Sequence, residues 1–206
     1  MSFSDPLITF KTYIKPALTL EDLRPLLEAW GLWCFCHSFL LTDWVRKRAE
    51  KRPFLRRWGR LLYNLFSSLT LLPLTGWTYL ADGPYVFRWP SWTLPLRMLV
   101  ILVAFYLLFA AFRVYGFWEF LGFKEVSFAL KQEGILKRLR HPLYTAGFLL
   151  LWVRDQTLAW FWTDLLLSIY LLLGTWLEER KLRRIFPEYE EYAQRVPPFW
   201  PRIKSS

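Results

Sequence analysis

Apolar residues run along this chain in stretches that are longer than the helices of an ordinary soluble domain. Segments with few or no charges cover residues 25–45, 61–81, 94–122 and 157–177. Residues 61–81 are 21 consecutive positions without a charge, and a helix of that length, rising about 1.5 Å per residue, crosses about 30 Å of hydrocarbon. The pattern therefore predicts helices that span a membrane.

A fifth apolar segment is shorter than the others. Residues 142–153 are 12 uncharged positions that end before Arg154 and Asp155. Twelve residues give about 18 Å of helix, which does not cross a bilayer alone. We therefore expect the helix that starts at Pro142 to begin below the membrane surface, inside the bundle.

The composition supports a membrane protein rather than a soluble one. The 206 residues are 54% hydrophobic, 20% aromatic and only 21% charged, which is too apolar for one water-soluble core and excludes a disordered chain. Two cysteines two positions apart exclude a disulfide scaffold. No linker or internal repeat divides the chain, so we expect one domain over 1–206, with its N-terminal spans in 25–122. We predict an all-α fold, a polytopic integral membrane bundle of about five transmembrane helices with a C-terminal helical hairpin and a cytoplasmic tail.

Basic residues are distributed unevenly between the loops. The net charge is +10, and 20 of the 27 lysines and arginines fall in residues 46–60, 124–140 and 180–206. Because cytoplasmic loops are enriched in Lys and Arg, this distribution predicts a multi-pass protein with a cytoplasmic C-terminus and an N-terminus outside. Contact with anionic lipids then accounts for the charge, so we expect membrane lipids, and no nucleic acid, as partners.

The first 24 residues are of mixed composition, with prolines at positions 6 and 16. They contain neither a long apolar core nor a small-residue cleavage site, so no signal peptide is expected. Thr19 followed by Asp22 is a capping-box pattern, which predicts a short interfacial helix ahead of the first span.

One histidine lies within the first span, beside two thiols. His37 follows Cys34 and Cys36, but residues two apart on a helix point in different directions and do not converge on one ion. A packing or hydrogen-bonding role is therefore favoured over a metal site, and no metal is predicted.

Other polar residues within the spans suggest contacts between helices. Asn64 and Asp164 are expected to be interhelical hydrogen-bond partners. Arg113 and Glu119 are costlier to bury, so an intramembrane site or an ion pair is one hypothesis for them.

A motif with chemical potential begins just before the short fifth segment. Arg140 and His141 precede Pro142, which suits the first turn of a helix. Free backbone N–H groups and the positive end of the helix dipole at such a start bind a carboxylate or a phosphate. Tyr144, three residues after His141, faces the same side of that turn. The alternative is an ordinary cytoplasmic boundary, where Arg and His are common.

A second motif follows the last span. Glu178 and Glu179 are adjacent acids in a cationic region, at the same end of the predicted hairpin as Arg140 and His141. An exposed helix with pairs such as Glu178–Lys181 explains each acid alone. It does not explain why both motifs end the two hairpin arms on one side, which favours a shared site.

Together the two motifs resemble a known family. Arg-His-Pro-x-Tyr-x-x-Gly, a hydrophobic hairpin, Glu-Glu-Arg-x-Leu and Tyr-x-x-Tyr fall within residues 134–201. This combination is similar to the isoprenylcysteine carboxyl methyltransferase superfamily, which includes phospholipid methyltransferases. Upstream, His37-Ser38, Tyr63-Asn64 and the run from Tyr115 to Gly122 resemble bacterial members, among them methanethiol methyltransferases and membrane proteins associated with nitric oxide reduction. This resemblance implies the bacterial plasma membrane as the location.

The resemblance implies an enzyme that uses S-adenosyl-L-methionine. It implies a cofactor at the cytoplasmic face, bound by Arg140, His141, Tyr144, Glu178 and Glu179. The implied reaction transfers a methyl group to a small or lipophilic acceptor: a thiol, a carboxylate or a lipid amine. It identifies no catalytic residue. The alternative is a non-catalytic membrane protein, of an assembly or transport type, that keeps the fold.

Overall fold

The computed structural model describes residues 19–124 and 129–200, which are mostly helical. In chain order, the elements are α1 (Leu20–Leu40), α2 (Asp43–Glu50), α3 (Pro53–Ala81), β1 (Tyr85–Phe87), the 3₁₀ turn η2 (Ser91–Thr93), α4 (Leu94–Tyr115), α5 (Phe117–Leu121), the 3₁₀ turn η3 (Gly134–Lys137), α6 (Pro142–Trp152), β2 (Gln156–Thr157), α7 (Leu158–Ile185) and α8 (Tyr189–Arg195). The all-α prediction is confirmed, except that two short strands were not expected.

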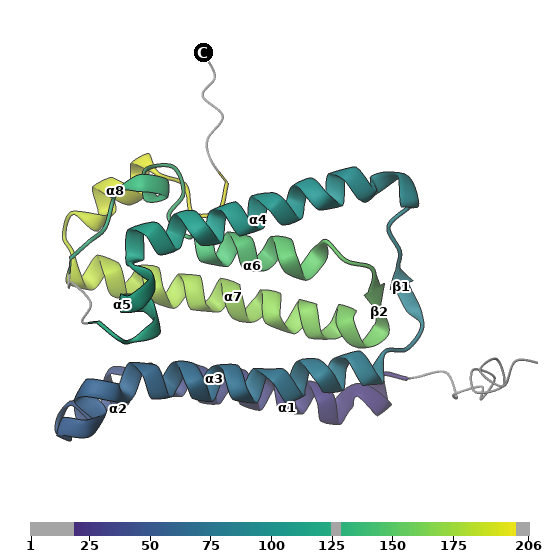
Figure 1. Ribbon diagram of the computed structural model, residues 1–206, viewed down its shortest axis with the longest axis horizontal. Helices are drawn as coiled ribbons and strands as arrows, with labels where there is room; N and C mark the ends of the chain where they lie inside the picture. The colour runs from purple at the N-terminus through teal and green to yellow at the C-terminus, as the bar shows by residue number, and fades with distance from the viewer. Residues whose placement is uncertain (1–18, 125–128, 201–206) are drawn as a thin grey trace, which may run out of the picture.

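The long helices run side by side (Figure 1). Helices α1 and α3 form a hairpin with α2 near its turn, and α7 packs against both. Helix α6 lies between α7 and α4 and packs most closely on α4. The two strands pair antiparallel at the end of the bundle far from α2. The opposite end, where α7 finishes and α8 lies, carries the two motifs.

Helix α1 begins with the predicted capping box. The Thr19 hydroxyl accepts from the Asp22 amide, and the Asp22 carboxylate accepts from the Thr19 amide. The helix then continues to Leu40, because Pro25 near its start removes one backbone hydrogen bond without ending it. The prediction of a separate short interfacial helix is therefore wrong.

The third apolar segment, residues 94–122, turns sharply at a point that its hydrophobic pattern did not predict. Helix α4 ends at Tyr115, and Gly116 has a φ of +82°, a conformation that favours glycine. Gly122, with a φ of +95°, ends the short helix α5, and a Cβ there would lie 2.7 Å from the backbone nitrogen of Leu61. The predicted single span over 94–122 is therefore too long.

Side chains of α3 hold this corner in place. Asn64 Nδ2 donates hydrogen bonds to the carbonyl oxygens of Phe120 (2.9 Å) and Leu121 (3.0 Å), which confirms its predicted role between helices. The Arg60 guanidinium donates to the carbonyl oxygen of Glu119 at 3.1 Å.

Arg113 and Glu119 do not form the ion pair considered for them within the part of the chain that is described. Arg113 is exposed in the last turn of α4, and Glu119 follows beyond the break. Gly116 turns the chain between the two side chains and separates them.

Two described helices are long and apolar enough to cross a membrane: α4, extended by the turn before it, and α7. Helix α6 is apolar but has only 11 residues, close to the length that its uncharged segment predicted. Helices α1 and α3, with 21 and 29 residues, have the length but a more mixed composition. The count of about five spans therefore stays a prediction.

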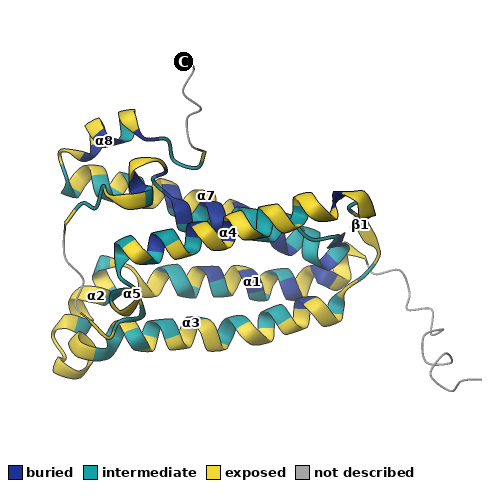
Figure 2. Ribbon diagram, turned by 45° about the horizontal axis from the view of Figure 1, so that its top comes forward, coloured by how far each residue is buried: buried dark blue, intermediate teal, exposed yellow. Residues whose placement is uncertain are grey.

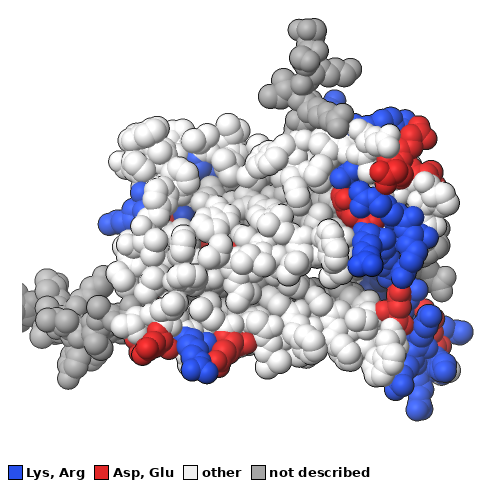
Figure 3. All heavy atoms as spheres, turned by 180° about the vertical axis from the view of Figure 1, so that it is seen from behind, with Lys and Arg blue, Asp and Glu red and all other residues white. Residues whose placement is uncertain are grey.

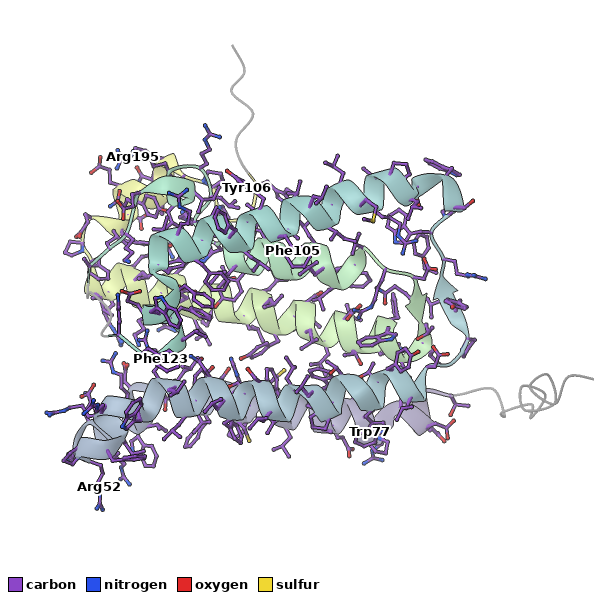
Figure 4. All side chains as sticks on the ribbon, in the orientation of Figure 1. Arg52, Trp77, Phe105, Tyr106, Phe123 and Arg195 are labelled. Carbon is purple, nitrogen blue, oxygen red and sulfur yellow. The ribbon has the colours of Figure 1, made fainter. Side chains whose placement is uncertain are left out.

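Small side chains bring the helices together, whereas large apolar ones face outward. Ala104 of α4 and Ala146 of α6 are fully buried in one cluster, the kind of contact that lets two helices approach closely. Figure 2 shows exposed positions along α3 and α4, and these include Phe105, Tyr106 and Trp77, of which Trp77 points away from the bundle in Figure 4. A soluble monomer rarely exposes so continuous an apolar surface.

A buried ion pair lies near the start of α7. Asp164 is fully buried and accepts hydrogen bonds from Arg154 Nη2 at 2.6 and 2.7 Å and from Gln156 Nε2 at 3.0 Å. Arg154 also lies over the Trp160 ring, 3.8 Å from its centroid. Asp164 is hydrogen-bonded, but the prediction that its partners lie on another helix is wrong, because Arg154 and Gln156 belong to the segment between α6 and α7.

We expect Asp164→Asn to destabilise the protein by about 2–3 kcal/mol, because it leaves the Arg154 charge without its counterion in a partly buried place. The matched control is Asp155→Asn, which loses a more exposed contact with Arg97 at 3.4 Å and should cost less than about 1 kcal/mol. Reversible unfolding in detergent micelles measures both. Equal decreases in the free energy of unfolding of the two variants would show that the buried pair stabilises the protein no more than the exposed one.

Candidate functional site

The site is built where the start of α6 meets the end of α7. Pro142 occupies the first turn of α6, where its missing N–H costs nothing and its fixed φ favours the helix. His141, immediately before it, is buried. Glu178 and Glu179 lie on α7 directly after the apolar run that ends at Leu177.

The segment after α8 folds back onto the start of α6. The backbone N–H of Arg140 donates to the carbonyl oxygen of Pro197, and that of His141 donates to Pro198, both at 3.0 Å. The expectation that free backbone N–H groups here bind an anion is therefore wrong for these two amides, because the returning chain occupies them. The side chains are left as the candidate ligand-binding groups.

Glu179 is the carboxylate that holds these segments together. It lies 2.6 Å from Arg140 Nη2, 3.0 Å from His141 Nε2 and 3.2 Å from Arg183 Nη2. Burial raises the pKa of Glu179, but the hydrogen bond from His141 and the charge of Arg140 outweigh burial, so this pKa lies below its ordinary value. The carboxylate is therefore ionised at neutral pH and accepts all three donors.

The Arg140 guanidinium has one further hydrogen-bond partner, and one of its nitrogens has none. Its Nη1 donates to the carbonyl oxygen of Ala193 at 2.7 Å. Its Nε is buried and has no hydrogen-bond partner among the described residues, and the same is true of the buried Tyr189 hydroxyl. Buried donors without partners are rare in native proteins and suggest an occupant that supplies acceptors.

Glu178, unlike Glu179, has a largely accessible carboxylate. Its side chain is 44% exposed, and its Oε2 lies 4.0 Å from His141 Nδ1. The pair with Lys181 that the alternative explanation invoked does not form, since Lys181 Nζ instead contacts Asp43 of α2 at 2.9 Å. Glu178 is therefore the more accessible of the two acids.

A cavity of about 180 Å³ lies beside these groups. It is lined by residues from five parts of the chain: Tyr115, Ala129, Leu130, Lys131, Leu136, Arg140, His141, Glu178, Leu182, Phe186, Tyr189 and Tyr192. Of the five predicted site residues, Arg140, His141 and Glu178 line it. Glu179 lies behind Arg140, and Tyr144 packs edge-on against His141 with 5.6 Å between ring centroids.

Four polar lining residues were not predicted as site residues. Tyr189 and Tyr192 formed a visible Tyr-x-x-Tyr pattern, and the Tyr192 hydroxyl donates to the carbonyl oxygen of Leu136 at 2.7 Å. Tyr115 ends α4, and Lys131 Nζ donates to the carbonyl oxygen of Val114 at 2.7 Å. The tyrosine spacing was a usable signal, whereas the sequence around Lys131 offers none.

His37 and its neighbouring cysteines lie in another part of the bundle. Cys34 is buried and Cys36 is half-buried. His37 contacts hydroxyl groups of α3, Ser67 at 3.1 Å and Tyr63 at 2.6 Å, which confirms the predicted hydrogen-bonding role.

Comparison with known proteins agrees with the motifs. A family model described as NnrU protein matches residues 25–175. A methanethiol S-methyltransferase from Crocosphaera subtropica is 29% identical over 196 residues, which cover 84% of this chain and 72% of that protein. No solved structure matches the chain. The two matches confirm the methyltransferase-like resemblance of the sequence at the level of the family. Because the family model covers well over half of its residues, the chain belongs to the NnrU family.

Proposed function

We propose that this protein is a membrane methyltransferase that uses S-adenosyl-L-methionine at the end of the bundle where α6 starts and α7 finishes. The observation that carries the proposal is the cavity beside Arg140, His141 and Glu178, with two buried donors that lack partners. The similarity to a methanethiol S-methyltransferase supports the reaction type. The acceptor class proposed here is a small or lipophilic molecule.

The residues at the cavity fit the chemistry of the cofactor. The free Arg140 Nε and the Tyr189 hydroxyl are donors, and the cofactor offers a carboxylate and ribose hydroxyls as acceptors. The accessible carboxylate of Glu178 suits an ammonium or sulfonium cation. The cavity is smaller than the ~300–1,000 Å³ of typical small-molecule sites, so it would hold part of the cofactor and widen for the rest.

Each residue has a distinct task in this proposal. Glu179 fixes the Arg140 guanidinium, so that Nε, the guanidinium nitrogen without a partner, is held in place for a ligand. His141, held between the two acids, orients the start of α6. Bound S-adenosyl-L-methionine supplies an activated methyl group, and the protein aligns the acceptor with it and excludes water, which suffices for a direct displacement at carbon.

The charge distribution supports a cytoplasmic location for this end. Figure 3 shows Lys and Arg gathered at one end of the molecule, beyond a broad uncharged middle. Arg52 near α2 and Arg195 of α8 lie at that end (Figure 4). A multi-pass protein with its basic end in the cytoplasm receives the water-soluble cofactor from the cytosol, while a lipophilic acceptor enters from the membrane.

We expect Glu178→Gln to weaken binding of S-adenosyl-L-methionine by about 1–3 kcal/mol, because a charge-assisted contact with a cation is lost. Isothermal titration of detergent-purified protein measures the affinity. Glu191→Gln, at an exposed acid of α8 that pairs only loosely with Arg195 at 3.7 Å, is the matched control and should bind normally. Unchanged affinity in the folded Glu178 variant would remove this carboxylate from the site.

Tyr189→Phe and Tyr192→Phe should change different properties of the protein: the first its affinity for the ligand, and the second its stability. Tyr189→Phe removes a hydroxyl without a partner, so the free protein should be as stable as before, whereas its affinity for S-adenosylhomocysteine should fall several-fold. Tyr192→Phe leaves the buried Leu136 carbonyl without its donor and should destabilise the free protein by about 1–3 kcal/mol. Thermal unfolding with and without ligand separates the two. If Tyr189→Phe changes neither quantity, its hydroxyl does not face the ligand.

The orientation is tested with single cysteines at two exposed positions, in a background where Cys34 and Cys36 are alanine. Lys51→Cys at the end of α2 should be protected from a membrane-impermeant thiol reagent in intact cells, and Trp92→Cys in η2 should react. Permeabilised cells provide the control in which both react. The reverse pattern would invert the topology, and equal labelling in intact cells would contradict the proposed number of crossings.

A further inference from the structure

His37 of α1 lies among hydroxyl groups and aromatic rings in the middle of the bundle. Its Nε2 is 2.6 Å from the Tyr63 hydroxyl, and its Nδ1 is 3.1 Å from the Ser67 hydroxyl. The Trp33 ring stacks on the imidazole, with 4.7 Å between centroids, and the Tyr170 ring of α7 meets its edge at 6.2 Å. Three helices therefore surround this imidazole with neutral groups.

A row of positions on α7 connects this cluster with the cavity. Tyr170, Gly174 and Glu178 are spaced by four residues and share one face of the helix. Tyr170 and Ser38 hydroxyls lie 2.9 Å apart. At the middle position, a Cβ on Gly174 would lie 3.6 Å from the Tyr144 hydroxyl, so Tyr144 of α6 covers this glycine. The row covers about 12 Å of helix.

The energetic cost of this arrangement points to a function. Polar and ionisable side chains in a membrane interior are expensive, and they mark sites of ligand or proton movement more often than sites of simple packing. The two hydroxyls that contact His37 can each donate or accept. They therefore satisfy the ring nitrogens when the imidazole is neutral and also when it is protonated and both nitrogens donate.

We propose that His37 accepts the proton of the methyl acceptor, and that this acceptor is a small neutral thiol. The proposal rests on the methyltransferase function proposed above and assigns a second part of the same site. His37 lies on the far side of Tyr170 and Tyr144 from Glu178, so the acceptor would meet the methyl group between the two clusters.

The surroundings of His37 favour a thiol over the other acceptor classes. A carboxylate needs no base and brings a charge that requires a cation, and the side chains that contact His37 are neutral. An ammonium ion would enter the same apolar surroundings with an uncompensated charge. A thiol enters uncharged and becomes a strong nucleophile only when it loses its proton.

The proposed step is balanced without any further reagent. The Tyr63 hydroxyl, 2.6 Å from His37 Nε2, passes its proton to His37 and takes the proton of the thiol. The acceptor sulfur forms a bond with the methyl carbon, while the bond from that carbon to the sulfonium breaks and its electron pair stays on the cofactor sulfur. The imidazolium then releases its proton to water.

The first test compares His37→Gln with the unmodified protein in detergent, with ethanethiol as acceptor. Glutamine keeps a hydrogen-bonding group but accepts no proton at neutral pH. S-adenosylhomocysteine affinity should stay within about twofold, and methyl transfer near pH 7 should fall by about 100-fold or more. The defect should shrink as the pH rises from 7 to 9, because the fraction of ethanethiol that is already ionised in solution rises about tenfold per pH unit while the pH stays below the pKa of the thiol. The other titratable side chains around His37 are Tyr63 of α3, Tyr170 of α7 and the thiols of Cys34 and Cys36 on its own helix. Both proteins in the comparison therefore carry alanine in place of the two cysteines.

The matched variant is Ser67→Ala, which removes one hydroxyl contact and leaves the base. It should keep methyl transfer within about tenfold and leave its pH profile unchanged in shape. A defect in His37→Gln that is equal at every pH, or that is matched by Ser67→Ala, would make His37 a structural residue and overturn the proposal. Normal transfer by His37→Gln would overturn it as well.

The second test does not depend on turnover. The chain contains only two histidines, His37 and His141, so isotope-labelled imidazole signals are assigned with one His37→Gln sample. With S-adenosylhomocysteine bound, ethanethiol should shift the His37 signals, whereas acetate and ethylammonium of similar size should not. If the protein binds S-adenosylhomocysteine but ethanethiol does not shift the His37 signals, the proposed role of His37 is overturned and the proposed function is not. Absence of S-adenosylhomocysteine binding in the unmodified protein would instead contradict the proposed function.

Discussion

A single half-buried carboxylate joins the segments on which the site depends. Glu179 of α7 receives donors from Arg140 and His141, which precede α6, and from Arg183 one turn later on its own helix. An ionised carboxylate in this position is stable only with several donors, because each desolvated charge costs several kcal/mol that good geometry must offset. The start of α6 is therefore positioned by an electrostatic requirement as well as by apolar packing.

The chain after α8 is bound to the same place. Arg140 donates to Ala193 through its side chain and to Pro197 through its backbone. The residue that neutralises Glu179 is thus also the residue that binds the chain after α8 to the start of α6. Loss of Glu179 would remove the counterion of Arg140, whereas loss of Glu178 would leave this ion pair intact. The two adjacent acids therefore have different tasks.

The sequence pattern predicted the helices better than it predicted their ends. The uncharged run 61–81 lies within α3, and the short run before Arg154 corresponds to α6, because an uncharged run of sufficient length indicates a helix whichever way its side chains face. The corner at Gly116 was missed, since an isolated glycine in an apolar run does not reveal whether its φ is positive. The paired strands were missed as well, because β2 is only two residues long and has no period to detect.

Within the site, the sequence predicted which residues meet but not which of them face the cavity. Adjacent residues on a helix point about 100° apart, so Glu178 and Glu179 could not both have the same surroundings. Only the packing of α7 on α6 decides which one is enclosed. The contacts of Pro197 and Pro198 were unpredictable for another reason: they use backbone carbonyl oxygens, which every residue has. The spacing of a motif predicts which side chains come together, but it does not predict hydrogen bonds between backbone groups.

Charged, polar and small residues follow one another along α7 at defined distances from its basic end. Their order determines which groups a molecule bound at the site can contact. Asp164 lies near its start, Tyr170 and Gly174 in its apolar part, and Glu178 at its basic end. Because Gly174 has no side chain, the Tyr144 ring of α6 approaches the α7 backbone closely, with its hydroxyl between the levels of Tyr170 and Glu178. An alanine Cβ at this position would make only ordinary contact with the Tyr144 ring, whereas a longer side chain would displace this ring from α7. The small residue at position 174 therefore determines how near the Tyr144 hydroxyl lies to the α7 backbone. Close approach at a small residue brings polar groups of two helices together, since elsewhere apolar side chains fill the space between the helices.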